Sequence, residues 1–364
     1  MKIINDIIDI KNIDTNIKYF NEFKQLYKYL FFDIETTGLS PERDYIFMLC
    51  YAIIKEKNIF LTQIMCECAE DEPELLKTFS ENICDDNIFI TYNGNSFDIP
   101  FIMKRCEKYG INISFNEKID IYREITRYKS VFLLENYKQK TIEKFLKIPR
   151  KDTLSGKEMT RLYKKYISEK DNRDESLLLQ HNYEDVFNLI KLLDIKKYLM
   201  VFEGEFEDIT YNTEQYSDEN GNKAIDFIIK ATFKYSVPTS VSFNNKSSFV
   251  KIHNNEVTIS TRAYNGELLY FFEDYKNYYY LPFEDYAIHK SVASYVDRNY
   301  RIQAKASNCY QHVNGTFIPA YNSNEHKKFV KKYNDDKEYI LLNDKTFNTS
   351  ELICNYVKNI FENM

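Results

Sequence analysis

The chain has 364 residues, of which 44% are hydrophobic and 29% are charged, and its formal net charge is -6. This length suffices for two domains with substantial cores, and the balance of apolar and charged residues is typical of a soluble globular protein. The negative net charge excludes a generally basic surface. Any polyanion must therefore be held by a local groove, by metal ions or by a partner.

Cysteine usage and the first residues bear on the cellular compartment. The seven cysteines are odd in number and form no C-x-x-C pair, which favours free thiols in a reducing environment over disulfides or a zinc site. The chain does not start with the basic and then apolar order of a secretory signal, and no apolar run reaches membrane-spanning length. We therefore expect a cytoplasmic protein without membrane contact.

The elements predicted for the first half alternate between strands and helices. A polar lead-in over residues 1–27 is expected to contain a short amphipathic helix over 16–26. The predicted strands span residues 29–32, 45–54, 59–65, 87–92 and 118–122. The predicted helices span residues 71–83, 95–109 with Gly110 as the stop, 141–146, 156–168 and 174–198. This order predicts an α/β domain over residues 28–200, with a mixed five-stranded sheet flanked by helices.

The first predicted strand carries two carboxylates at its end. Tyr29–Phe32 is an apolar run of strand length, and Asp33 and Glu35 follow it. Residues i and i+2 of a strand point to the same face, so these carboxylates project together. Two like charges at close range repel unless a cation lies between them, which favours a divalent metal held by oxygen ligands. A solvated strand end is the alternative.

Two later segments bring further acids to the same region. Asp98 lies at a helix start just past the strand at 87–92, where open α/β sheets place their ligands. His181 and Asp185 are four residues apart on the long helix and share one of its faces. Such a set of acids can hold two metal ions about 3.5–4 Å apart, an arrangement that cleaves phosphodiesters. His181 is the candidate to take the proton of the attacking water near neutral pH.

These residues resemble the DEDD (DnaQ-like) 3'-5' exonuclease superfamily, which has a ribonuclease H-like fold. Phe32–Gly38 matches its first motif, Asn93–Asp98 matches its N-x-x-x-F-D second motif, and His181–Asp185 stands for the third. Within the superfamily the chain looks most like the bacterial YprB-type ribonuclease H-like proteins, on residues 135–137 and 140–146. The third motif departs from the family pattern, because it combines a histidine with the three-residue spacing of the tyrosine subclass.

The resemblance covers about residues 28–200 and implies 3'-5' exonucleolytic hydrolysis of DNA or RNA at a single-stranded 3' end. It implies two Mg²⁺ or Mn²⁺ ions held by the four acids, with His181 completing the catalytic set. It also places four residues beside the substrate: Thr36, Thr37, Gly38 and Asn93. The alternative roles are strand-end capping for the two threonines and a turn for Asn93. The competing functions are a binding module that does not cut and a structure-specific endonuclease.

Two other acids of the first half are interpreted as structural. Asp120 ends the strand predicted at 118–122 and is expected to brace a neighbouring segment. Glu184 lies next to Asp185 but turns to another side of the helix, so we expect it to be solvated.

The second half, residues 201–364, has a different texture and no catalytic motif. Hairpin signals between β-prone runs occur at residues 220–221, 254–255, 265–266 and 314–315. With helices expected over 285–296 and 349–363, they predict an α+β accessory domain rich in antiparallel sheet. Basic residues between 289 and 305 lie among tyrosines. Such a mixture can stack bases and hold phosphates, although an ordinary polar sheet surface is the favoured interpretation.

Overall fold

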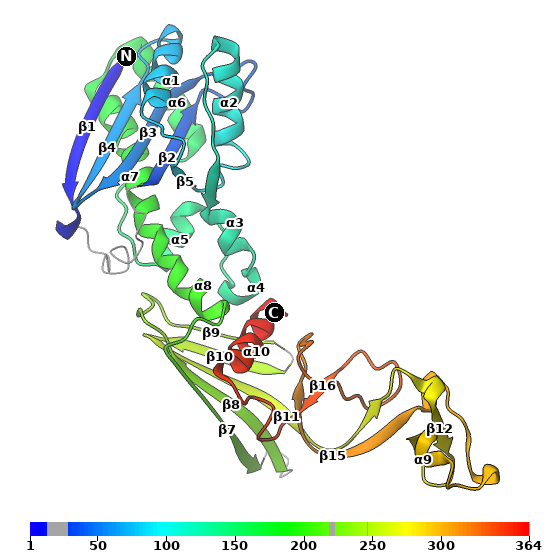
Figure 1. Cartoon of the computed structure of the whole chain (residues 1–364). Helices are drawn as coiled ribbons and strands as arrows, with labels where there is room; N and C mark the ends of the chain where they lie inside the picture. Colours follow the sequence, from blue (N-terminus) through cyan, green and yellow to red (C-terminus); the bar gives the residue numbers. More distant parts are fainter. Residues whose placement is uncertain (13–27, 218–222, 246, 364) are drawn as a thin grey trace. The chain divides into compact units, whose positions relative to one another are not determined.

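The structure is a computed structural model that describes residues 1–12, 28–217, 223–245 and 247–363 (Figure 1). The chain divides into two compact units, residues 1–196 and 197–364. The helix expected over 16–26 lies outside the described residues. Within the described ranges, no helix combines the length and the apolar character needed to cross a membrane.

A mixed six-stranded sheet lies at the centre of the first unit (Figure 1). Its strands, in spatial order, are β1 (Lys2–Asp9), β4 (Asn58–Met65), β3 (Ile46–Lys55), β2 (Tyr29–Thr36), β5 (Ile88–Thr91) and β6 (Glu117–Asp120). The first four are antiparallel neighbours, whereas β2, β5 and β6 run parallel. The carboxyl ends of the three parallel strands therefore lie at one edge of the sheet, the usual place for a ligand site.

The expected number of five strands is wrong, because β1 lies within the segment interpreted as a lead-in. It pairs with β4 along its whole length, from Lys2 opposite Met65 to Asp9 opposite Asn58. As an edge strand it is mostly half-exposed or exposed, so it lacks the apolar pattern that reveals a buried strand. Backbone hydrogen bonds to β4 hold it in the sheet.

Helices flank the sheet of the first unit. They are α1 (Glu72–Glu81), α2 (Asp98–Tyr109), α3 (Ile121–Thr126), α4 (Lys129–Phe132), α5 (Gln139–Phe145), α6 (Gly156–Glu169) and α7 (Asn172–Leu192), with 3-10 turns at Ile10–Asn12, Ala69–Asp71 and Leu193–Ile195. Gly110 ends α2 with φ of +67°, as predicted. The long helix expected over 174–198 is interrupted by the last of these turns, and α8 (Lys196–Phe202) follows it.

The two faces of β2 have different tasks. Leu30, Phe32 and Ile34 belong to an apolar core that includes residues of α1 and α2. The intervening residues Asp33 and Glu35 point to the opposite face, because successive side chains of a strand alternate. On that face a second core joins β3 and β4 to α6 and α7. The alternation thus directs the two carboxylates toward the helices that cover the other side of the sheet.

The second unit is built on two antiparallel sheets, which confirms the predicted sheet-rich α+β class. The larger contains β16 (Tyr339–Leu341), β15 (Tyr310–Pro319), β11 (Glu256–Phe271), β10 (Ser248–His253) and β9 (Val241–Asn244), and β8 (Lys223–Thr232) joins β7 (Asp208–Ser217) to β11. The smaller has the order β13 (Tyr286–His289), β12 (Tyr278–Leu281), β14 (Ile302–Gln303). The remaining elements are α9 (Lys290–Ala293), α10 (Ser350–Glu362) and 3-10 turns at Tyr275–Asn277, Arg298–Tyr300 and Ala306–Asn308.

Two of the expected hairpin turns are continuous strand. Residues 265–266 lie inside β11 and residues 314–315 inside β15, and Gly266 stands opposite Gly315 in the register of these strands. The first half of β11 pairs with β8 and β10, whereas its second half pairs with β15. An Asn-Gly dipeptide favours a hairpin only where its flanking runs pair with each other, and here both runs have distant partners.

Of the other two hairpin signals, residues 254–255 do join β10 to β11, with His253 opposite Glu256. Residues 220–221 lie outside the described residues.

The helix expected over 285–296 is also wrong. Tyr286–His289 pairs with β12 as a strand, and only Lys290–Ala293 is α-helical. Val292 and Tyr295 were expected on the buried face, but they are 57% and 90% exposed. Their helical spacing therefore does not report a packed face.

Candidate functional site

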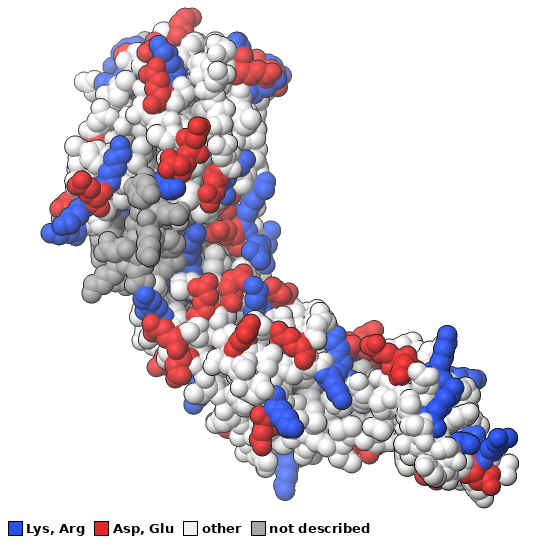
Figure 2. Space-filling model, viewed as in Figure 1, with Lys and Arg blue, Asp and Glu red and all other residues white. Residues whose placement is uncertain are grey.

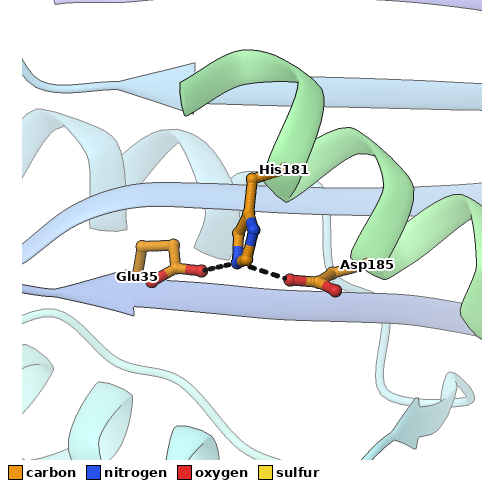
Figure 3. Close-up of side chains that lie close together, drawn as sticks. All are labelled: Glu35, His181 and Asp185. Carbon is orange, nitrogen blue, oxygen red and sulfur yellow. Dashed lines mark ion pairs between the residues drawn. The ribbon is translucent and has the colours of Figure 1, made fainter. Parts of the chain in front are cut away.

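Glu35 of β2 meets two side chains of α7 at the carboxyl edge of the sheet (Figure 3). His181 Nε2 lies 3.1 Å from Glu35 Oε1 and 3.1 Å from Asp185 Oδ2. The side chains of Glu35, His181 and Asp185 are only 12%, 5% and 14% exposed. In the part of the chain that the structure describes, these three form the group of potential metal ligands whose atoms lie within 4.8 Å of one another.

Asp98 and Asp33 lie beside this group. Asp98 Oδ1 accepts a hydrogen bond of 3.2 Å from the backbone N–H of Ile34, the residue between Asp33 and Glu35. Burial raises the pKa of Asp98 to about 7. Burial, followed by the charges of Asp98, Asp185 and Glu35, raises the pKa of Asp33 well above its usual range. The structure therefore brings all four predicted acids into one region where like charges repel.

The donor set fits hard divalent cations such as Mg²⁺ or Mn²⁺. Such ions prefer carboxylate oxygens, and the site offers four of these side chains together with one imidazole nitrogen. Among the described residues no group donates a hydrogen bond to the carboxylate of Asp33, although burial and repulsion penalise its charge. A bound cation would compensate this charge, which makes Asp33 the residue that most needs a metal partner.

His181 is held from behind by Asp152, a residue of the segment between α5 and α6. The Nδ1 atom of His181 lies 2.8 Å from Asp152 Oδ2, so Nδ1 carries the shared proton and Nε2 faces Glu35 and Asp185. Burial would lower the pKa of His181, but hydrogen bonds to Asp152, Asp185 and Glu35 raise it to about 12. In this arrangement the imidazolium charge balances the neighbouring carboxylates.

Arg150 connects the same carboxylates and is only 8% exposed. Its guanidinium lies 2.6 Å from Asp185 Oδ1, 2.9 Å from Asp152 Oδ2 and 3.0 Å from Glu143 Oε1. Burial would raise the pKa of Asp185, but the hydrogen bond to His181 and the charges of His181 and Arg150 lower it. Asp185 is therefore the well-compensated acid of the site, in contrast to Asp33.

Sequence reasoning missed Arg150 and Asp152, and it misjudged Glu184. Glu184 is 14% exposed rather than solvated, and it accepts the backbone N–H groups of Lys151 at 3.1 Å and Asp152 at 2.8 Å. It thereby fixes the segment that carries Asp152. The contact joins residues more than thirty positions apart, so no local pattern announces it.

Asp120 has the structural role that was expected for it. Its carboxylate accepts the backbone N–H groups of Asn93 at 2.8 Å and Asn95 at 3.1 Å. These bonds hold the turn that leads into Asp98. Asn93 itself has φ of +63°, a turn conformation that asparagine tolerates well.

The residues expected beside a substrate take part in contacts at the end of β2. Thr36 Oγ1 donates to Gly38 O at 2.7 Å, and the hydroxyl of Thr37 accepts the backbone N–H of Tyr45 at 3.1 Å. A Cβ atom on Gly38 would lie 2.3 Å from Asp44 Oδ2, so a side chain there would displace Asp44. These contacts explain the local sequence, and the role of Thr36, Thr37, Gly38 and Asn93 toward a substrate stays a prediction.

Comparison with known proteins places this site in a known fold. Residues 30–196 match the family RNase_H_2 of the RNase_H superfamily. Over 97 residues the chain is 38% identical to a DNA polymerase of Pyrococcus glycovorans, covering 24% of this chain and 12% of the polymerase. Over 128 residues it is 35% identical to the PolC-type DNA polymerase III of Ureaplasma parvum, covering 28% of this chain and 9% of that protein. The chain thus spans only a small part of these relatives.

Among solved structures, the family B DNA polymerase of Pyrobaculum calidifontis aligns with a TM-score of 0.39 and 13% identity, over 70% of this chain and 36% of the polymerase. The family match covers the whole mixed sheet from β2 to β6 and the helices up to α7. Residues 30–196 therefore form a domain of the ribonuclease H-like superfamily.

Proposed function

We propose that this chain is a metal-dependent nuclease of the DEDD type, most similar to the YprB-type proteins, that shortens nucleic acid from the 3' end. The observation that carries the proposal is the convergence of Asp33, Glu35, Asp98 and Asp185 at the edge where the parallel strands end. Partial similarity to DNA polymerases, which handle nucleic acid, supports the same class of substrate.

The four acids would hold two Mg²⁺ or Mn²⁺ ions. Bound there, such ions would promote the ionisation of water and stabilise the charge that develops on the leaving oxygen of a phosphodiester. The protein's own part is to keep the carboxylates ionised in a buried site, and Arg150 and His181 supply the positive charge that does so for Asp185.

His181 is the proposed acceptor for the proton of the attacking water. Its Nε2 faces the cluster, whereas Asp152 holds Nδ1 on the other side of the ring. Tyr183, the tyrosine within the third motif, instead stacks on Phe187 with ring centroids 5.4 Å apart. This favours the histidine despite the unusual spacing. Thr36, Thr37, Gly38 and Asn93 are the proposed neighbours of the terminal nucleotide.

The proposal is tested with single-stranded DNA and RNA of one sequence, incubated with Mg²⁺, with Mn²⁺ or with a chelator. A 5'-labelled strand should shorten stepwise, a 3'-labelled strand should release labelled mononucleotide first, and the chelator should stop both reactions. Asp98→Asn is the inactive control, because its amide oxygen can still accept the N–H of Ile34. Cleavage of a circular strand would indicate an endonuclease, and binding without any cleavage would indicate a non-cutting module.

We expect Asp152→Asn to lower the turnover rate by about 10- to 100-fold, the usual effect of removing a residue that orients an active-site histidine. Loss of the carboxylate also lowers the pKa of His181, so the acidic limb of the pH-rate profile should move to lower pH. Glu184→Gln is the matched control, since Glu184 holds the same segment through its backbone without touching the ring. An unchanged acidic limb in Asp152→Asn would contradict the positioning role.

A further inference from the structure

A small part of the second unit, residues 272–309, has its large apolar side chains on the outside. We call it the aromatic lobe. Its buried residues include Ala287, Ala304 and Cys309. Its exposed residues include Phe283 (79%), Tyr286 (37%), Val292 (57%), Tyr295 (90%), Tyr300 (53%) and Ile302 (50%). Scattered apolar side chains on a surface are ordinary, but a concentration of this kind within twenty residues marks an interaction surface.

Positive charge accompanies these rings, although the whole chain is acidic. Residues 286–305 contain the bases Lys290, Arg298, Arg301 and Lys305 against the single acid Asp297. The carboxylate of Asp297 accepts the backbone N–H of Asn299 at 2.9 Å. Figure 2 shows Lys and Arg side chains on the visible face of the part that carries β12 and α9, at the lower right.

The two faces of β12 separate the positive charge from the negative charge. Tyr279 lies under Arg301 and Lys290, whose charged groups are 4.9 Å and 5.7 Å from its ring centroid. Tyr280, on the opposite face by the alternation of the strand, hydrogen-bonds the carboxylate of Asp285. The face with Tyr279 is therefore the cationic one.

Phe283 and Tyr300 form an open aromatic pair on the same lobe. Their ring centroids are 5.9 Å apart and both rings are more than half exposed. Tyr295, the most exposed of these rings, lies between α9 and the 3-10 turn that contains Arg298. Flat rings that remain in water at this density, each within a few residues of a base, provide stacking surfaces next to partners for phosphate.

We propose that the aromatic lobe binds single-stranded nucleic acid, with unpaired bases stacked on Phe283, Tyr295 and Tyr300 and phosphates paired with Lys290, Arg298 and Lys305. Alternating rings and cations match the alternation of base and phosphate along a strand. An apolar protein partner would not need the four bases. The proposal rests on the proposed function in so far as the bound strand is the substrate, but binding is measurable without cleavage.

The test uses the full chain in chelator and a fluorescent single strand of about 15 nucleotides, long enough for a groove of usual site size. Binding is followed by fluorescence anisotropy over a range of salt. We expect Phe283→Ser/Tyr300→Ser to weaken binding by about 10-fold or more, because each stacked base contributes strongly. Lys290→Gln/Arg298→Gln should lower the salt slope by about 2, one for each lost phosphate contact.

The matched control is Phe249→Ser/Lys251→Gln, an aromatic and a lysine on the exposed side of β10. It should bind the strand within about twofold of the parent chain, since it removes the same chemistry outside the lobe. Thermal melts show that each variant is folded. Unchanged affinity in both lobe variants would overturn the proposal and leave a protein partner as the alternative, and equal competition by duplex would overturn base stacking.

Failure of the two proposals can be told apart. Asp98→Asn should lose cleavage but keep full affinity, because Asp98 is not part of the lobe. A parent chain that never cleaves, but whose affinity falls in the lobe variants, would refute the nuclease and keep the lobe. A cleaving chain whose affinity is indifferent to the lobe variants would refute the lobe alone.

Discussion

Asp33→Asn is expected to abolish cleavage and, at the same time, to raise the melting temperature of the metal-free chain. Burial and the charges of Asp98, Asp185 and Glu35 raise the pKa of Asp33. A pKa that is higher in the folded than in the unfolded chain means that ionisation of Asp33 destabilises the fold as pH rises. The neutral amide removes that cost. For a domain of this size, each kcal/mol gained corresponds to about 2–4 °C.

Asp185→Asn should be equally inactive but less stable. The pKa of Asp185 is lowered, so its charged form stabilises the fold above the pKa of the unfolded chain, and this stability is lost as pH falls. The amide weakens the contacts to His181 and Arg150, at a cost of about 1–3 kcal/mol in the free energy of unfolding. Either substitution should slow cleavage by about 10³-fold, because metal ions contribute several kcal/mol to the barrier.

These two variants are compared by thermal melts at neutral pH in chelator and in Mg²⁺, together with the cleavage assay. Mg²⁺ should raise the melting temperature of the parent chain through preferential binding to the folded state. It should do so far less in Asp33→Asn. Melting temperatures that fall alike in both variants would contradict the account of Asp33 as the uncompensated acid.

Arg150→Met is expected to cause the largest loss of stability, about 3–5 kcal/mol in the free energy of unfolding, because it leaves buried carboxylates without their cation. Arg150 contacts Asp185, Asp152 and Glu143 within 3.0 Å and is 8% exposed. Arg150→Lys should recover part of the loss, since a lysine keeps the charge but cannot contact the three acids with one planar group. Urea unfolding followed by circular dichroism measures both.

The control for Arg150 is Lys165→Met on α6. Lys165 lies 2.7 Å from Asp174, but its side chain is 48% exposed. An exposed pair of this kind contributes at most about 1 kcal/mol, so the control should unfold close to the parent chain. Equal losses for the buried arginine and the exposed lysine would refute the central role of Arg150.

The candidate acids were predictable because each depends on a short-range rule. Asp33 and Glu35 share a face since a strand alternates, and His181 meets Asp185 since a helix returns to the same face after four residues. The parallel arrangement of β2 and β5 then follows from the strand-helix-strand order, and it brings Asp98 to the same edge. Chain termination at Gly110 is likewise a local property of glycine.

Contacts between distant segments decided the rest. β1 joins the sheet through backbone hydrogen bonds that do not depend on its side chains, and the Asn-Gly dipeptides at 265–266 and 314–315 stay extended because their strands pair elsewhere. Arg150 and Asp152 reach the site only because Glu184 fixes their segment against α7. Local pattern was enough to name the carboxylates of the site. The cation that balances them and the residue that orients the histidine became visible only in three dimensions, since electrostatic compensation acts across space and leaves no period in the sequence.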